Sequence, residues 1–438
     1  MTLTNLEIGM LSFPALLLLI FLRVPIGLAM FIVGFFGLYF VTGGTNMGLT
    51  RLRTAAYSTF ANYSLSIVPM FLLMGYFATL GGMSQVLFRA AAGFLGHRKG
   101  GVGMAAIASC AGFGAICGSS LATAATMGRV ALPELKRFGY HGGIATASLA
   151  AGGTLGILIP PSVVLVIYAI LAEQNIATLF MAAFVPGILA AIGYMIAIRL
   201  YVALYPDRAG VREPVPWGER LRLLAAVWPV LLIFFVVVGG IYGGIFTPTE
   251  GAAVGALGTG LIAWFSGGLT WRTLIDSITA TAQSSAMIFF IVFGAAFFNG
   301  FLAITQLPQT LATQVGGLDV SPIMVLIIIL GIYLLLGCVM DSLSMILLTV
   351  PIFFPVIMAL DFGMTPEQVA IWFGILVLIV VETGLITPPV GMNLFIINAM
   401  DRATAIVETY KAVIFFVVSD LIRVALFVAF PVIVVFLV

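Results

Sequence analysis

Long apolar stretches separated by short polar segments run along almost the whole chain. They cover residues 8–22, 24–42, 62–82, 100–133, 140–172, 178–204, 222–246, 250–266, 279–302, 320–360, 367–400 and 412–438. A membrane-spanning helix needs about 20 mainly apolar residues, so many of these stretches are long enough to cross a bilayer. The pattern predicts an all-α, polytopic membrane protein. The composition agrees, since only 8% of the 438 residues are charged.

The two halves of the chain, separated by a polar segment at 206–222, carry the same features in the same order. Residues 156–161 read GILIPP, and residues 384–389 read GLITPP. Upstream of each Pro-Pro pair, a long apolar stretch has a small polar centre, at 118–121 in the first half and at 340–343 in the second. A repeated order of this kind indicates a duplicated unit.

The charged residues indicate that the two units are inverted. Basic residues stand on both sides of the first polar centre, at Arg98, Lys99, Lys136 and Arg137. Since Lys and Arg mark the cytoplasmic face, this stretch should enter and leave the membrane there, as a re-entrant hairpin. The stretch at 320–360 has no Lys or Arg nearby, so its ends should lie on the opposite face. Two such units form an inverted repeat. In this scheme Arg51 and Arg53 lie on the side of the membrane opposite the cytoplasm, against the charge rule. A short helix on the membrane surface is one explanation for their position.

Each Pro-Pro pair should break a helix inside the membrane, because proline removes a backbone donor and clashes with the preceding turn. The freed carbonyls and neighbouring hydroxyls can form an oxygen cage for a hard monovalent cation such as Na⁺. Suitable hydroxyls are those of Ser119, Ser120, Thr154, Ser342, Thr383 and Thr387. The alternative is a pair of ordinary proline kinks whose hydroxyls bond only their own helices. The pairing of each break with a polar hairpin tip favours cation sites.

Two acidic residues near the second polar centre, Asp341 and Glu382, each have two open interpretations. An intramembrane carboxylate can be functional, balancing the charge of a cation or lining a water-filled path. It can equally be structural, accepting hydrogen bonds from hairpin amides. Asn393, Asn62 and Ser66 could bind a substrate carboxylate or hydroxyl, or form interhelical hydrogen bonds. The amino ends of the half-helices would also attract an anionic substrate.

The sequence lacks the motifs of an intramembrane enzyme or of a nucleic-acid-binding protein. His97 and His141 lie beside basic residues in expected loops, and neither a His-Glu-x-x-His nor a phosphate-binding Gly-Lys-Ser/Thr motif occurs. No basic patch is interleaved with aromatic residues, so no nucleic-acid partner is expected. Paired broken helices around a closed midplane site favour a secondary active transporter with alternating access over a continuous pore.

Three sequences resemble those of a known family. They are GIFTPTE at 244–250, LGILIPPS at 155–162 and GLITPPVGMN at 384–393. Because these three sequences occur in the same order as in that family, the chain resembles the large membrane subunit (the DctM or SiaM type) of tripartite ATP-independent periplasmic (TRAP) transporters. The resemblance covers essentially the whole chain.

This resemblance implies a three-component system in the bacterial inner membrane. One partner would be a small four-helix membrane subunit, and a periplasmic substrate-binding protein would deliver the substrate. Import would be driven by Na⁺ and would use an elevator motion, in an architecture of the ion-transporter superfamily. The substrate would be a small carboxylate such as a C4-dicarboxylate, sialic acid or a related organic acid. A stand-alone Na⁺-coupled carboxylate carrier of the same architecture is the alternative.

The resemblance also implies a division of the chain and two Na⁺ sites. Scaffold helices would cover 1–83 and 174–269, arm helices 84–97 and 270–278, the transport domain 98–173 and 279–405, and a C-terminal helix 406–438. The first Na⁺ site would comprise Ser119, Ser120, Gly153 and Thr154, with carbonyls before Pro160. The second would comprise Gly337, Ser342, Gly384 and Thr387, with the carbonyl of Val390. Asp341 would lie near the substrate or the second Na⁺ site.

Overall fold

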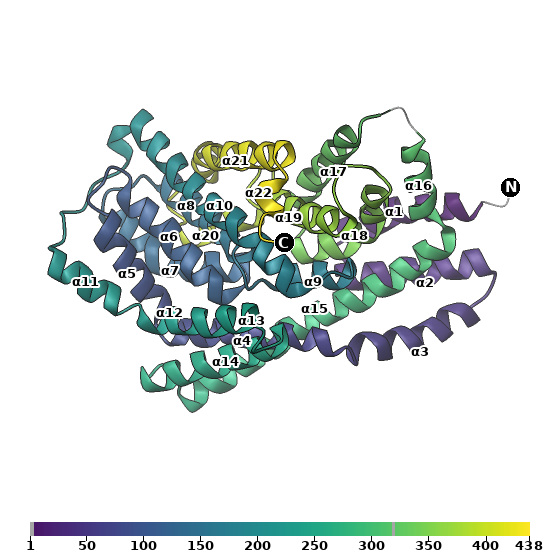
Figure 1. Cartoon of the computed structure of the whole chain (residues 1–438), viewed down its shortest axis with the longest axis horizontal. Coiled ribbons are helices and arrows are strands. Elements are labelled where there is room, and N and C mark those ends of the chain that lie inside the picture. The colour runs from purple at the N-terminus through teal and green to yellow at the C-terminus, as the bar shows by residue number, and fades with distance from the viewer. Residues whose placement is uncertain (1–3, 318–319) are drawn as a thin grey trace.

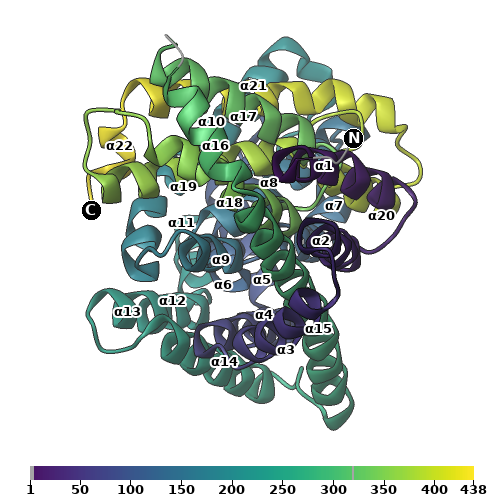
Figure 2. The same ribbon diagram turned by 90° about the vertical axis from the view of Figure 1, so that its right-hand side faces the viewer.

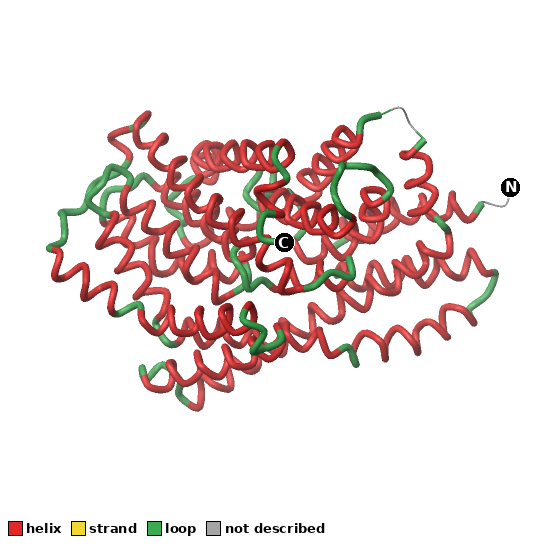
Figure 3. Tube along the Cα trace, viewed as in Figure 1, coloured by secondary structure: helices red, strands yellow, loops and turns green. Residues whose placement is uncertain are grey.

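The structure, a computed structural model, describes residues 4–317 and 320–438. Residues 1–3 and 318–319, which belong to the predicted ranges 1–83 and 279–405, lie outside this description. All regular structure in the described residues is helical (Figure 3). Five of the described helices are long and apolar enough to cross a membrane, or seven if each of two bent pairs counts as one span. The predicted all-α membrane fold is confirmed.

The first repeated unit is a helical hairpin followed by a broken helix. It comprises α6 (Gly101–Cys117), α7 (Ser120–Arg137), α8 (Gly142–Leu158) and α9 (Val163–Leu171). Gly118 and Ser119 form the tip between α6 and α7, and Gly118 has a φ of +65°, a conformation that favours glycine. α8 and α9 are bent by 45° relative to each other because Pro160 and Pro161 interrupt the helix.

The second unit repeats this arrangement. It comprises α17 (Pro322–Gly337), α18 (Ser342–Met358), α19 (Pro366–Gly384) and α20 (Met392–Met400). Segment 338–341 forms the tip of the second hairpin, and the loop at 385–391, which contains Pro388 and Pro389, separates α19 from α20. Both predicted hairpins and both predicted helix breaks are therefore confirmed.

The two units interlock into one body. α9, which follows the break of the first unit, packs against α18 of the second hairpin, while α20 packs against α7 of the first. The helices that precede the breaks lie at the centre, and α8 is buried from Gly143 onward and α19 from Val369 onward. α8 consists largely of Gly, Ala, Ser and Thr, which let helices approach closely within a membrane. The interlocking brings both hairpin tips to one cavity.

A second group of helices packs along one side of this body, at the lower side of Figure 1. It comprises α2 (Ile26–Thr42), α3 (Asn46–Phe60), α4 (Ile67–Leu80), α14 (Pro248–Phe265) and α15 (Trp271–Thr305). α2 and α15 touch closely, since a Cβ on Gly294 would lie 2.1 Å from the carbonyl oxygen of Gly27. The short helix α3 carries Arg51, which donates a hydrogen bond to the carbonyl of Ala296 in α15 (3.4 Å). α4 contacts α6, and α15 contacts α18, so this group borders both hairpins.

The predicted arm segments correspond to different kinds of element. α5 (Met83–Leu95) matches the segment at 84–97. The segment at 270–278 is the start of α15, which continues without interruption to Thr305. The division into scaffold, arm and transport domain remains a prediction.

The remaining helices complete the outer parts of the molecule. They are α1 (Asn5–Phe21), η1 (Tyr63–Ser66), α10 (Ile176–Leu204), η2 (Pro206–Arg208), α11 (Trp217–Ala225), α12 (Trp228–Phe234), η3 (Phe235–Gly239), α13 (Gly240–Tyr242), α16 (Leu307–Gly316), α21 (Ile406–Ala429) and α22 (Val432–Val435). α10 and α21 pack against each other and against α8, at the top of the view in Figure 2. They cover the central helices on the side away from α14 and α3.

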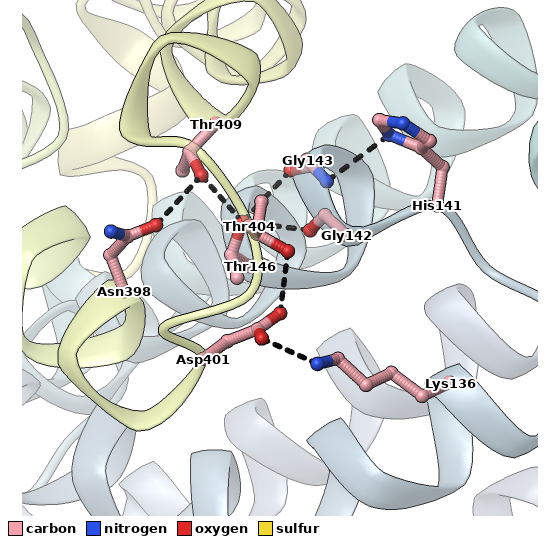
Figure 4. Close-up of polar contacts among 9 residues, drawn as sticks. All are labelled: Lys136, His141, Gly142, Gly143, Thr146, Asn398, Asp401, Thr404 and Thr409. Carbon is pink, nitrogen blue, oxygen red and sulfur yellow. Dashed lines mark hydrogen bonds and ion pairs between the residues drawn. The ribbon is translucent and has the colours of Figure 1, made fainter.

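A polar cluster ties the two units together at the turn between α7 and α8 (Figure 4). Lys136 donates to the carboxylate of Asp401, which also accepts a hydrogen bond from Thr404 (2.6 Å). Nearby, the hydroxyls of Thr146 and Thr409 lie 2.8 Å apart. Burial by itself would raise the pKa of Asp401, but the hydrogen bonds from Lys136 and Thr404 and the charge of Lys136 hold that pKa below its ordinary value. The cluster therefore contains a charged pair between the two units.

Candidate functional site

The two hairpin tips border a cavity of about 120 Å³. Its polar lining comes from the tips, and its apolar lining includes residues of α4, α9 and α15. The complete lining consists of Leu72, Gly118, Ser119, Ser120, Leu121, Ile157, Val163, Val164, Met287, Ile288, Asp341, Ser342, Leu343 and Leu385. The roughly 10–15 Å³ that a single water molecule needs fits into this cavity several times. Four residues that the sequence marked as candidates, two from each tip, thus share one cavity.

Three helices begin at this cavity, and in each of them the side chain of the N-cap residue accepts a hydrogen bond from a backbone amide of the first turn. Ser119 caps α7 by accepting a hydrogen bond from the amide of Ala122 (3.5 Å), and Asp341 caps α18 by accepting one from Ser344 (3.0 Å). Ser162 caps α9. The amino ends of helices carry partial positive charge and attract anions. Among the described residues that line the cavity, none is Lys or Arg.

Close backbone contacts bring the candidate cation ligands together. A Cβ on Gly384 would lie 2.6 Å from backbone atoms of Gly337, so the carboxyl ends of α17 and α19 touch without room for a side chain. In the first unit, a Cβ on Gly153 would lie 3.1 Å from the carbonyl oxygen of Ser120, and one on Gly156 would lie 2.7 Å from that of Ser119. Helix carboxyl ends present unpaired carbonyls with partial negative charge, which suits a cation.

The remaining candidate ligands already have partners within the protein. The hydroxyl of Thr154 lies 2.7 Å from the carbonyl oxygen of Ala151 and 3.0 Å from the hydroxyl of Tyr194. The hydroxyl of Thr387 donates to the carbonyl of Thr383 (2.6 Å). The carbonyl of Val390 accepts a hydrogen bond from Tyr410 of α21 (3.3 Å).

Glu382 is buried in the last turn of α19 and faces the hairpin tips. Its Oε1 accepts a hydrogen bond from the hydroxyl of Ser342 (2.5 Å), and the hydroxyl of Ser120 is a second polar neighbour of the carboxyl group. Its Oε2 is buried without a hydrogen-bond partner among the described residues. The carboxylate is therefore held by side-chain hydroxyls, whereas the sequence had also left open hydrogen bonds from hairpin amides.

A buried network centred on Asp420 joins the ends of α8 and α19 to α10 and α21. One carboxylate oxygen of Asp420 accepts hydrogen bonds from Tyr194 (2.8 Å) and Thr383 (3.2 Å), and the other accepts one from Arg423 (2.7 Å). Tyr194 in turn contacts Thr154. This network was not predicted from the sequence, although a charged pair three residues apart in the apolar stretch 412–438 was a usable signal.

The three polar candidates outside the tips are not brought to the cavity. Asn393 is buried at the start of α20, and its side-chain amide donates to the carbonyl of Ala150 in α8 (3.2 Å). Asn62 caps η1 by accepting a hydrogen bond from the amide of Ser64 (2.9 Å). Ser66 donates to the carbonyl of Tyr63 (2.6 Å). Their assignment to the substrate remains a prediction, and these local contacts do not support it.

Comparison with known proteins identifies the family. The family model described as "Tripartite ATP-independent periplasmic transporter, DctM component" matches residues 13–433. The chain belongs to this family. The C4-dicarboxylate TRAP transporter large permease protein DctM of Pseudomonas aeruginosa is 36% identical over 355 residues, which is 80% of each chain. The ectoine TRAP transporter large permease protein TeaC of Halomonas elongata is 32% identical over 100% of this chain and 98% of that one.

A further relative supports this assignment, and a solved structure has a similar fold. The sialic acid TRAP transporter large permease protein SiaM of Vibrio cholerae is 31% identical over 87% of each chain. Among solved structures, the YdaH transporter of Alcanivorax borkumensis is similar in fold, with a TM-score of 0.63 and 16% identity, covering 87% of this chain and 88% of that one. The chain is thus a TRAP transporter large permease, a multi-pass protein of the bacterial inner membrane and not an enzyme.

Proposed function

We propose that this TRAP permease imports a small carboxylate together with Na⁺. A periplasmic binding protein would deliver the substrate, and a small four-helix membrane subunit would complete the complex. The observation that carries the proposal is the cavity between the two hairpin tips, where Ser119, Ser120, Asp341 and Ser342 meet.

The cavity has properties that suit an anion bound together with cations. The amino ends of α7, α9 and α18 and the serine hydroxyls offer hydrogen-bond donors to a carboxylate. The carboxylate of Asp341 would repel the substrate, and no Lys or Arg from the described residues lines the cavity to offset it. Bound Na⁺ would supply the missing positive charge, so carboxylate binding would depend on Na⁺.

The chain offers two places for Na⁺, one beside each hairpin tip. In the first, carbonyls of the tip approach Gly153 and Gly156. In the second, the carboxyl ends of α17 and α19 meet at Gly337 and Gly384. Carbonyl and hydroxyl oxygens suit a hard cation. Among the described residues there is no group of three or more His, Cys, Asp or Glu side chains that could hold a metal ion.

We further propose alternating access by an elevator motion. The cavity lies where the interlocked body of hairpins and broken helices meets α4 and α15, because Leu72, Met287 and Ile288 form part of its wall. Movement of this body along α4 and α15 would carry the cavity, its substrate and its ions together from one side of the membrane to the other. The apolar contacts across this wall can slide without breaking a polar interaction.

The relatives and the cavity support a small carboxylate as the substrate. The names of three relatives specify C4-dicarboxylates, sialic acid and ectoine, each of which contains a carboxylate. A C4-dicarboxylate is the substrate in the name of the DctM relative that is 36% identical to this chain, so it is the first substrate to test.

Reconstitution tests this proposal. Proteoliposomes would contain the chain with or without a small four-helix TRAP membrane subunit. The binding protein would be added outside with labelled C4-dicarboxylate, sialic acid or ectoine. We expect uptake only with all three proteins and an inward Na⁺ gradient. Uptake by the chain alone would support the stand-alone carrier, and uptake that does not respond to Na⁺ would contradict the cation sites.

A further inference from the structure

Glu382 is a buried carboxyl group that has no cationic partner among the described residues. Its side chain is 1% exposed, and α19 is buried along most of its length. One carboxylate oxygen binds the hydroxyl of Ser342, and the other has no partner among the described residues. A buried carboxylate is costly unless a cation or several hydrogen bonds compensate it. Either a proton or a bound cation would therefore complete this site, since no side chain among the described residues does so.

The nearby charged groups do not provide the missing charge. Asp420 is also buried, but Arg423 pairs with it at 2.7 Å, and this pair carries no net charge. Asp341 is half-buried at the cavity and is engaged as the N-cap of α18. Within the part of the chain that the structure describes, the ion pairs that occur do not involve Glu382.

The position of Glu382 relates it to both candidate cation sites. Its two hydroxyl neighbours are Ser120 at the start of α7 and Ser342 at the start of α18, one from each hairpin. Ser120 belongs to the candidate ligands of the first site, and Ser342 belongs to those of the second. Gly384, whose backbone touches Gly337, is two residues further along α19. A single carboxylate thus stands between two sets of oxygen ligands that are otherwise built from neutral groups.

We propose that Glu382 is the shared anionic group of the two Na⁺ sites and that it couples their occupancy. This inference rests on the proposed function. Two cations in a low-dielectric interior repel each other, and a carboxylate between them offsets that repulsion. Binding of the first ion also fixes the carboxylate and the hydroxyls of both tips in the arrangement that the second ion needs. The two ions therefore bind cooperatively, with a coupling free energy that depends on the charge of Glu382.

The test measures Na⁺ binding without transport. The full-length chain, with its small subunit where that is needed for stability, is purified and titrated with NaCl replaced by choline chloride at constant ionic strength. The readout is the midpoint of thermal unfolding. We expect the wild-type midpoint to rise with Na⁺ along a curve with a Hill coefficient above 1. In Glu382→Gln we expect the Na⁺ concentration for half the effect to rise about tenfold or more and the Hill coefficient to fall to about 1.

Controls separate this result from a loss of folding. Glu367→Gln makes the same chemical change at the exposed start of the same helix and should leave the Na⁺ curve unchanged. In Na⁺-free buffer, Glu382→Gln should melt at or above the wild-type temperature, because the change removes a buried charge. If Glu382→Gln does not fold, Ser120→Ala and Ser342→Ala, which keep the carboxylate, should each weaken the response to Na⁺.

The outcomes distinguish this inference from the proposed function. A cooperative Na⁺ response in the wild type that is unchanged in Glu382→Gln, or unchanged in both serine variants, would overturn the role of Glu382 and leave Na⁺ coupling intact. A wild-type protein that does not respond to Na⁺ would overturn both. A weaker response that keeps its cooperativity would show that Glu382 serves one site and does not couple two.

Discussion

Substitution of Gly384 by alanine should separate the second hairpin from the central helix. A Cβ at this position would lie 2.6 Å from the backbone carbonyl carbon and the Cα of Gly337, whereas carbon atoms in contact normally stay about 3.5–4.0 Å apart. The helix ends must therefore move apart by about 1 Å, because backbone atoms cannot rotate away as a flexible side chain can. Overpacking of this kind costs about 1–3 kcal/mol, and we place it near 3. Alanine recovers up to about 1 kcal/mol as the better helix former, which leaves a loss of about 2 kcal/mol.

The effect on transport should exceed the effect on stability. Candidate ligands of the second Na⁺ site come from both sides of this contact, and a binding site tolerates displacements of about 0.5 Å. We expect Gly384→Ala to fold with a lower thermal midpoint and to need much more Na⁺ for uptake in proteoliposomes. Gly331→Ala is the matched control, since a Cβ there meets nothing within 4 Å, and it should be neutral or slightly stabilising. Wild-type uptake and stability in Gly384→Ala, or equal damage in both variants, would refute this reasoning.

Four further substitutions test other parts of the account. Asp420→Asn leaves the guanidinium of Arg423 buried without an anionic partner and should lower the unfolding free energy by about 3–5 kcal/mol. Thermal unfolding measures this loss, and an unchanged midpoint would contradict the buried network. Lys136→Met removes the cation beside Asp401, and a loss of about 1–2 kcal/mol is expected at pH 7. The pKa of Asp401 is lowered in the folded protein, so its contribution is present above the ordinary carboxyl pKa and is lost as the pH falls through the folded pKa. The difference from wild type should therefore persist down to about pH 4 and shrink as the pH falls further, and a difference that grows below pH 4 would be inconsistent with the pair. Ser119→Ala and Thr387→Ala should each raise the Na⁺ concentration for half-maximal uptake without unfolding the protein, and unchanged Na⁺ dependence in both would argue against these ligands.

The sequence was most informative where proline and small polar residues interrupt apolar stretches. Pro160, Pro161, Pro388 and Pro389 located both helix breaks, because proline cannot continue a helix whatever its neighbours are. The polar centres at the two hairpin tips were also located correctly. The two tips meet at one cavity because the two units interlock. The repeated order of elements suggested this arrangement, but hydrophobic periodicity alone does not determine it.

The sequence was less informative about which face a polar residue occupies and what it contacts. Asn62 and Ser66 lie near a proline, but they satisfy the backbone at the start of α4 and do not reach the cavity. Asp420 and Arg423 were overlooked because they lie in an apolar stretch of α21. The other partners of Asp420, Tyr194 and Thr383, come from helices that lie more than 30 residues away in the sequence. The boundary expected at residue 278 lies inside α15, since no Gly or Pro stands there to end a helix.

Coupled flux is the most direct test of the central claim that this permease moves a carboxylate together with Na⁺. Proteoliposomes containing the complete complex would receive radioactive Na⁺ and labelled C4-dicarboxylate at the same time, in the presence of the binding protein. The account predicts that each flux requires the other substrate and that their ratio stays constant as either concentration is varied. Carboxylate uptake without accompanying Na⁺ entry would contradict it.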